Sequence, residues 1–147
     1  MFIKLDEKTC VNLKKIRYVY VDETEKTQVM VFVGDGLPYP KCERYQRLYY
    51  GYKLEVNSED DSVDVCRDIL NSKDFALLRV SQSKVLLLNI KYFQNNLTFI
   101  EDVGDKTRLC FANNDDHMDI NLPYNDVLLH LSTSLMGYEP CISFEKR

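Results

Sequence analysis

The residues that could do acid–base or metal chemistry are few, because the 147-residue chain holds only two histidines. His117 lies in a polar run with three carboxylates, Asp115, Asp116 and Asp119, which could together bind a cation. A calcium loop needs a glycine turn and a later glutamate, and the glycine is missing here. We therefore interpret this run as a solvated hairpin tip. His130 lies among leucines, which is typical of a partly buried helical residue, so we expect neither histidine to be catalytic.

A second group of carboxylates lies in the acidic run at residues 57–64. Glu59, Asp60, Asp61 and Asp64 could pair for acid–base work, but they lie at the start of an expected helix. Acids at that position interact favourably with the helix dipole, by about 0.3–1 kcal/mol, so capping and solubility explain them. The sequence also lacks the GxSxG, GxGxxG and P-loop spacings of serine hydrolases, dinucleotide sites and phosphate sites. We therefore predict that the protein is not an enzyme and uses no cofactor.

The cysteines indicate neither a disulfide framework nor a metal site. Their number is odd and no CxxC pair occurs, so disulfides and zinc ligands are not predicted. They are Cys10, Cys42, Cys66, Cys110 and Cys141. Cys10, Cys66 and Cys110 fall in apolar segments, so we expect them to be reduced, buried packing residues of a cytoplasmic protein.

The most unusual composition is found at residues 36–53, a basic segment that holds five of the ten tyrosines. It has four cations and one glutamate, on a chain whose net charge is −4. Tyrosine and arginine are enriched at binding hot spots, and aromatic rings with cations also bind single-stranded nucleic acid. A third interpretation is that the tyrosines pack on the segment's own sheet. We predict a protein partner or self-association, with a short helix presenting the anchors. The expected anchors are Arg44, Tyr45, Arg47, Tyr49 and Tyr50.

The rest of the sequence alternates in the manner of β-strands, with turn residues between the strands. In the first half, strands are expected at 2–5, 10–13, 17–22, 28–33 and 52–56, before a helix at 61–70. In the second half, strands at 75–80, 84–90, 97–101, 108–112 and 118–122 precede a helix at 125–132, with Asn125 as its cap.

The same order of elements thus occurs twice, and short echoes support a repeat. KTQV at 26–29 resembles KTRL at 106–109, and the pair Asp-Val lies in both expected helices. We predict a mainly β fold with short helices (α+β), made of two degenerate β-meander-plus-helix units. The units are residues 1–72, with the insertion at 36–53, and residues 73–147. We expect them to pack as one compact domain, because each alone would be marginally stable.

The first strands resemble the LytTR family of bacterial DNA-binding domains. In FIKLDEKTCVNLKKI the family's register is kept by Phe2, Lys4, Val11, Asn12, Leu13 and Ile16, and a partial echo, LLRVSQSKVLLLNIK, keeps Arg79 and Ser83. The family presents His-Arg-Ser to DNA, whereas this chain has Asp6, Glu7 and Lys8 there, and acids repel phosphates. The resemblance implies a transcriptional regulator that binds DNA through Arg79, Gln82, Ser83 and Lys84.

Composition and charge describe the class of protein. Hydrophobic residues make up 45% and charged residues 29%, which is typical of a globular chain. No apolar run approaches the ~18 residues that indicate a membrane span, and acids in the N-terminal MFIKLDEKTC argue against secretion. We predict a cytoplasmic, non-enzymatic protein-binding or assembly module of the kind found among accessory and phage-encoded factors. A LytTR-like DNA-binding regulator is the alternative.

Overall fold

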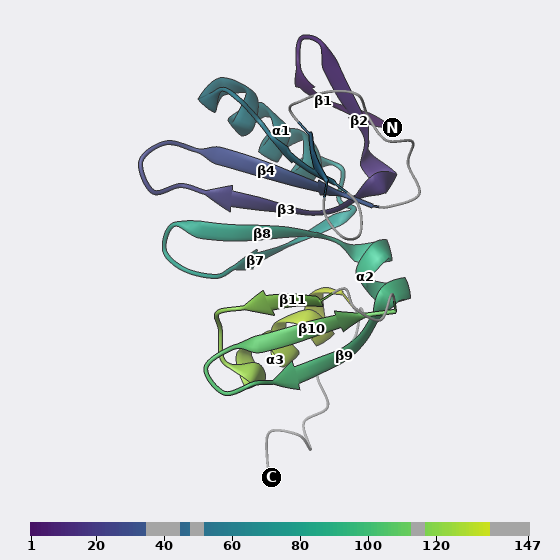
Figure 1. The fold of residues 1–147 in the computed structure, drawn as a ribbon, viewed down its shortest axis with the longest axis vertical. Helices are drawn as coiled ribbons and strands as arrows, with labels where there is room; N and C mark the ends of the chain where they lie inside the picture. Colours follow the sequence, from purple (N-terminus) through teal and green to yellow (C-terminus); the bar gives the residue numbers. More distant parts are fainter. Residues whose placement is uncertain (35–44, 48–51, 113–116, 136–147) are drawn as a thin grey trace. The chain divides into compact units, whose positions relative to one another are not determined.

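The computed structural model describes residues 1–34, 45–47, 52–112 and 117–135 of the chain (Figure 1). The chain divides into two compact units, Met1–Asn89 and Ile90–Arg147. Each unit combines antiparallel strands with helices, and strands predominate over the described residues taken together. The predicted fold class, mainly β with short helices, is therefore confirmed.

The first unit is built on a six-stranded antiparallel sheet with the strand order β5-β6-β4-β3-β8-β7. A separate two-stranded sheet, the β1–β2 hairpin, precedes it and leads through the short helix η1 into β3. The bounds are β1 (Phe2–Asp6), β2 (Thr9–Asn12), η1 (Leu13–Lys15), β3 (Ile16–Asp22), β4 (Gln28–Val33), β5 (Tyr45–Arg47), β6 (Tyr52–Glu55), β7 (Phe75–Arg79) and β8 (Lys84–Asn89).

The core of the first unit lies between one face of this sheet, the β1–β2 hairpin and the helix α1 (Glu59–Asn71). On β3 and β4 buried side chains alternate with half-buried ones, so Val19, Val21, Val29 and Val31 belong to the core. Burying a side chain of this size contributes about 1.5–3 kcal/mol, which is what holds the helix and the hairpin to the sheet.

The start of α1 is fixed by polar contacts. The Ser58 hydroxyl oxygen accepts a hydrogen bond from the Asp61 N–H (3.1 Å), so the helix begins at Glu59, earlier than the predicted residue 61. The Glu59 carboxylate in turn accepts a hydrogen bond from the Thr27 N–H (3.1 Å). The first turn of the helix is therefore tied to the connection between β3 and β4.

The second unit is a three-stranded antiparallel sheet with the order β11-β10-β9, together with two helices. The bounds are α2 (Ile90–Asn96), β9 (Leu97–Asp102), β10 (Thr107–Phe111), β11 (His117–Ile120) and α3 (Tyr124–Ser134). The Phe93 ring of α2 meets the Phe111 ring of β10 edge to face, with 5.2 Å between centroids. Leu109, Ile120 and Leu131 are also buried. Figure 1 shows α3 behind this sheet, covering one of its faces.

The β7–β8 hairpin belongs to the first unit, whereas the predicted repeat assigned it to the second. β8 pairs with β3, with Leu88 opposite Tyr18 and Val85 opposite Val21. The division between the units therefore falls after Asn89 and not after residue 72. The physical reason is that β8 takes β3, a strand distant in sequence, as its second hydrogen-bonded neighbour beside β7, and local sequence does not specify such pairing. The packing of both units as one domain stays a prediction.

Two further helices differ from the sequence prediction. α2 begins at Ile90, where the sequence predicts the end of a strand because the apolar run of β8 extends up to that residue. α3 begins at Tyr124, after Pro123, which provides no side-chain hydrogen bond to the helix start. The predicted cap, Asn125, therefore lies inside the helix.

Candidate protein-binding site

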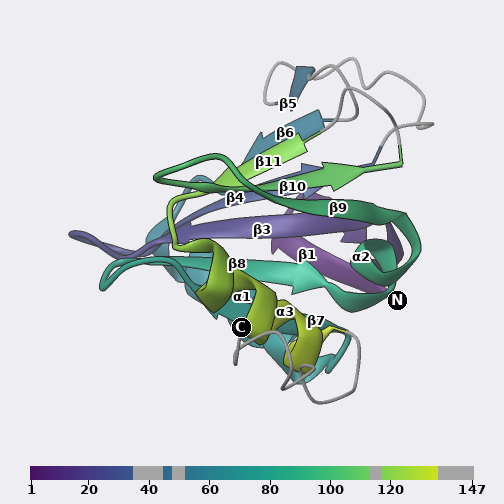
Figure 2. The same ribbon diagram turned by 90° about the horizontal axis from the view of Figure 1, so that it is seen from below.

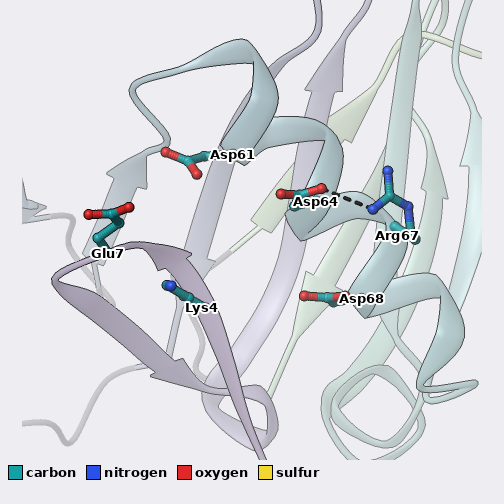
Figure 3. A pocket seen from close by; sticks show the side chains of 6 residues that line it. All are labelled: Lys4, Glu7, Asp61, Asp64, Arg67 and Asp68. Atoms are coloured by element: carbon teal, nitrogen blue, oxygen red, sulfur yellow. Dashed lines mark hydrogen bonds and ion pairs between the residues drawn. The ribbon is translucent and has the colours of Figure 1, made fainter.

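A recess of about 420 Å³ lies between the β1–β2 hairpin and α1, within the first unit (Figure 3). Its lining side chains are all charged: Lys4, Glu7, Asp61, Asp64, Arg67 and Asp68. We call this group the charged recess. Because it has four carboxylates and two cations, its net charge is negative.

The hairpin contributes Lys4 and Glu7 through its alternation and its tight turn. On β1, Ile3 and Leu5 are buried and Lys4 between them is exposed, as expected of a strand with one face on a core. Glu7 lies in the turn, where the Asp6 carboxylate accepts a hydrogen bond from the backbone N–H of the residue after Glu7 (2.8 Å). Both side chains therefore come from a segment whose backbone is held by its own hydrogen bonds.

The helix α1 contributes the other four side chains. Asp61, Asp64 and Asp68 are spaced i, i+3 and i+7, which places them on one face of a helix. Figure 3 shows them turned toward the hairpin, with Arg67 beside Asp64. The Arg67 Nη1 atom is 2.9 Å from Asp64 Oδ1, and the two side chains are 60% and 59% exposed. A pair this exposed contributes little to stability, so it leaves both groups able to exchange partners.

Beneath the charged recess the hairpin and the helix are joined by apolar side chains. Ile3 and Leu5 of β1 and Val65 and Ile69 of α1 belong to one buried cluster, and each is at most 2% exposed. The core therefore fixes the two walls of the recess, while the charged side chains remain in water.

The chemistry open to the charged recess is ionic binding. Within the described ranges, the contact between Arg67 and Asp64 is the one ion pair among its six residues. The three other acids of the recess, Glu7, Asp61 and Asp68, are therefore outside this ion pair, and Lys4 is the remaining cation of the recess. Carboxylates make their strongest hydrogen bonds to charged donors such as lysine and arginine side chains. Among the described residues, no group of three or more histidine, cysteine or acidic side chains could hold a metal ion.

The predicted anchors in the tyrosine-rich segment are only partly described. Arg44, Tyr49 and Tyr50 lie outside the described residues. Tyr45 and Arg47 lie on β5, the edge strand of the six-stranded sheet beside β6. The short helix predicted there is wrong for residues 45–47, because this backbone pairs as a strand. An edge strand presents backbone groups to a further strand, so the placement leaves the interface prediction open.

The residues that the LytTR resemblance implied for DNA binding lie in and beside the turn between β7 and β8: Arg79, Gln82, Ser83 and Lys84. Arg79 donates from Nη1 to the Gln82 carbonyl oxygen (3.0 Å) and lies 3.4 Å from the Glu23 carboxylate. The Glu23 N–H donates to the Ser83 carbonyl oxygen (2.6 Å), so this turn and the β3–β4 turn lie side by side (Figures 1 and 2). Arg79 therefore holds the two turns together. The Glu23 carboxylate lies beside the guanidinium that would have to contact a DNA phosphate.

Asp22, at the end of β3, is kept ionised by hydrogen bonds within the β3–β4 turn. Its carboxylate accepts hydrogen bonds from the Thr24 hydroxyl (2.6 Å) and the Thr24 N–H (2.9 Å), which lower the pKa of Asp22 below its ordinary 3.8. The charge of Lys84 acts weakly in the same direction.

These contacts make a testable contribution to the pH dependence of stability. Because the pKa of Asp22 is lower in the folded chain, the contacts stabilise the fold above the unfolded pKa and are lost as the pH falls through the folded pKa. We expect Thr24→Val, which removes the hydroxyl donor, to raise the pKa of Asp22 toward 3.8, measured by NMR titration of the carboxyl carbon. An Asp22 pKa that does not change in the variant would contradict the assignment.

Three cysteines lie in the described part of the chain. Cys66 and Cys110 are half-buried, but Cys10 is exposed, so the prediction that all three are buried is wrong. Cys10 lies opposite Lys4 in the β1–β2 register, on the outward face of the hairpin. Burial raises the pKa of Cys66 to about 11, so its thiol stays neutral at neutral pH.

The two histidines lie in the second unit. His130 is half-buried in α3, as predicted. His117 is the exposed first residue of β11, while Asp115 and Asp116 of the predicted hairpin tip lie outside the described residues.

Sequence reasoning found only part of the charged recess. The spacing of Asp61, Asp64 and Asp68 is a usable signal for a charged helix face, but capping alone also explains the acidic run at 57–64, and Asp68 lies beyond that run. Lys4 and Glu7 enter the sequence prediction only through the LytTR register. Nothing local in the sequence indicates that this hairpin lies against that helix.

No family model, no curated protein and no solved structure matches the chain. In the described ranges, none of the helices has the length and apolar character needed to cross a membrane. The function is therefore argued from the geometry of the charged recess.

Proposed function

We propose that the chain is a non-enzymatic protein-binding or assembly module, and that its partner places a basic segment in the charged recess. The observation that supports this is a recess whose two walls are held in place by the buried core and whose lining has more carboxylates than cations. The partner's contribution would be lysine or arginine side chains that enter between hairpin and helix and displace Arg67 from Asp64.

The physical case rests on complementarity of charge. Opposite potentials across an interface raise association rates and exclude wrongly charged partners more than they add affinity. Because the recess charges are exposed, binding should weaken as salt shortens the screening length, which is about 8 Å at physiological ionic strength. The free thiols of Cys10, Cys66 and Cys110 fit a reducing compartment, and we place the module in the cytoplasm.

The test is an NMR titration of the isotope-labelled full chain with a penta-lysine peptide, at low and physiological salt. We expect amide shifts at residues 4–7 and 61–68. We expect Asp61→Asn combined with Asp68→Asn to weaken binding about two- to thirtyfold, because each lost exposed ion pair is worth about 0.2–1 kcal/mol.

The matched control is Asp74→Asn combined with Asp105→Asn, which changes the net charge equally at two exposed acids outside the recess. This control should bind like the wild type. If the two double variants weaken binding equally, the effect belongs to total charge and the proposal fails. Peptide shifts that avoid both walls of the recess would refute it as well.

The LytTR-like alternative predicts a different binding result for the same protein and its variants. A DNA-binding regulator would bind duplex DNA with an affinity that falls steeply with salt. Arg79→Ala would then abolish that binding, whereas the recess variants would spare it. This result would replace the protein-binding proposal.

Self-association is the other partner class predicted from the sequence, and sedimentation velocity separates it from binding to another protein. If the charged recess receives a second copy, the wild type should dimerise and the recess double variant should be monomeric. A wild-type chain that stays monomeric up to millimolar concentration would leave a different protein as the partner.

A further inference from the structure

One face of the three-stranded sheet in the second unit is turned away from α3. Alternation along the strands places two rows of three side chains on this outer face. The register aligns Phe99 with Cys110 and Cys110 with His117, and it aligns Glu101 with Arg108 and Arg108 with Asp119. The outer face is therefore defined as Phe99, Glu101, Arg108, Cys110, His117 and Asp119.

The Phe99 side chain is 64% exposed on this face. It lies on β9, an edge strand of the sheet, and its backbone is held by pairing with β10. Single exposed hydrophobic residues are common, so Phe99 alone indicates nothing. What distinguishes it is the carboxylate two residues further along the same strand and on the same face, about 7 Å away along the strand.

That carboxylate, Glu101, is left without a strong partner by its neighbours. Arg108 lies opposite it but is engaged with Asp119, donating from Nε to Oδ1 (2.8 Å) and from Nη2 to Oδ2 (3.3 Å). This two-point contact raises the pKa of Arg108 and lowers the pKa of Asp119. Among the described residues, no hydrogen bond or ion pair is made by the Glu101 carboxylate, although Arg108 is near enough to feel its charge.

We propose that Phe99 and Glu101 form a contact site for an arginine side chain of a partner protein. The guanidinium is planar, so it can stack on an exposed ring while its N–H groups meet a carboxylate at the ring edge. A lysine ammonium can make the ionic contact but not the stacked one. The site thus selects arginine over lysine, and it is independent of the charged recess because it lies in the other unit.

The test compares a penta-arginine peptide with the penta-lysine peptide in the same NMR titration of the full chain. We expect penta-arginine to shift the amides of residues 99–101 and of Arg108 and Cys110 across the strand pair. We expect Phe99→Leu to weaken this binding about two- to fivefold by removing the stacked contact between the ring and the guanidinium. Glu101→Gln should weaken it to a similar extent by removing an exposed ionic contact.

The control variant is Glu25→Gln, which removes the same charge from an exposed glutamate in the first unit and should leave the shifts at residues 99–101 unchanged. Well-dispersed amide spectra of both test variants show that they are folded. Equal affinity of both peptides at Phe99, or shifts confined to residues 4–7 and 61–68, would overturn the proposal. The second outcome would leave the function proposed for the charged recess intact, and the two ideas can therefore fail separately.

Discussion

Replacing Phe93 with alanine is expected to lower the free energy of unfolding of the second unit by about 3–5 kcal/mol. The Phe93 side chain is 0% exposed, and its ring packs edge to face with Phe111 and with Tyr92, the latter at 5.8 Å between centroids. Truncation would remove these ring contacts and leave a cavity between α2 and β10. Amide hydrogen exchange on the full chain would measure the loss residue by residue.

A matched control for this prediction is Phe99→Ala in the same unit. Phe99 is 64% exposed, so the same truncation should cost little, within about 0.5 kcal/mol. Exchange protection in residues 1–89 should change less than protection in the second unit. If both phenylalanine variants destabilise the second unit equally, the assignment of Phe93 to its core is incorrect.

Leu5→Ala is expected to destabilise the first unit by about 2–5 kcal/mol. Leu5 is 0% exposed and belongs to the cluster that joins β1 to α1, so the variant would loosen the hairpin from the helix. Because that cluster is the floor of the charged recess, binding of penta-lysine should weaken together with stability. Urea denaturation followed by circular dichroism and the peptide titration would measure the two effects.

The control for Leu5 is Leu70→Ala, on the exposed side of α1. Leu70 is 42% exposed, and alanine is as good a helix former as leucine. The free energy of unfolding of the Leu70→Ala chain should therefore change by less than about 1 kcal/mol. A Leu5→Ala chain as stable as the Leu70→Ala chain would mean that the hairpin is not anchored to the core.

The parts of the fold that could be predicted from the sequence are those set by local patterns. The run QVMVFV predicted a strand at 28–33, and β4 occupies Gln28–Val33, because β-branched residues fit a pleated, buried strand. The predicted strand at 17–22 became β3 (Ile16–Asp22), one residue longer. A helix at 61–70 was also expected, since its apolar spacing is local, but α1 begins two residues earlier, at Glu59, behind the Ser58 cap.

The parts that could not be predicted depend on which strands pair. Nothing in the run VLLL of β8 indicates that its neighbour is β3, so the hairpin was assigned to the wrong side of the unit boundary. The start of α2 could not be predicted from the end of the same run, because a short apolar run is equally compatible with a buried strand and with the end of a buried helix. The charged recess could not be predicted from the sequence for the same reason, since its two walls are separated by more than fifty residues.

The outward position of Cys10 has a practical consequence for spectroscopy. The chain contains no tryptophan, so it has no intrinsic fluorophore that a partner's arrival would strongly perturb. Cys10 lies opposite Lys4, whose side chain lines the charged recess, whereas burial keeps Cys66 in its unreactive thiol form. With Cys42, Cys141 and the half-buried Cys110 changed to serine, a maleimide dye would attach preferentially at Cys10. Its emission would then report occupancy of the recess directly, in dilute solution and in real time.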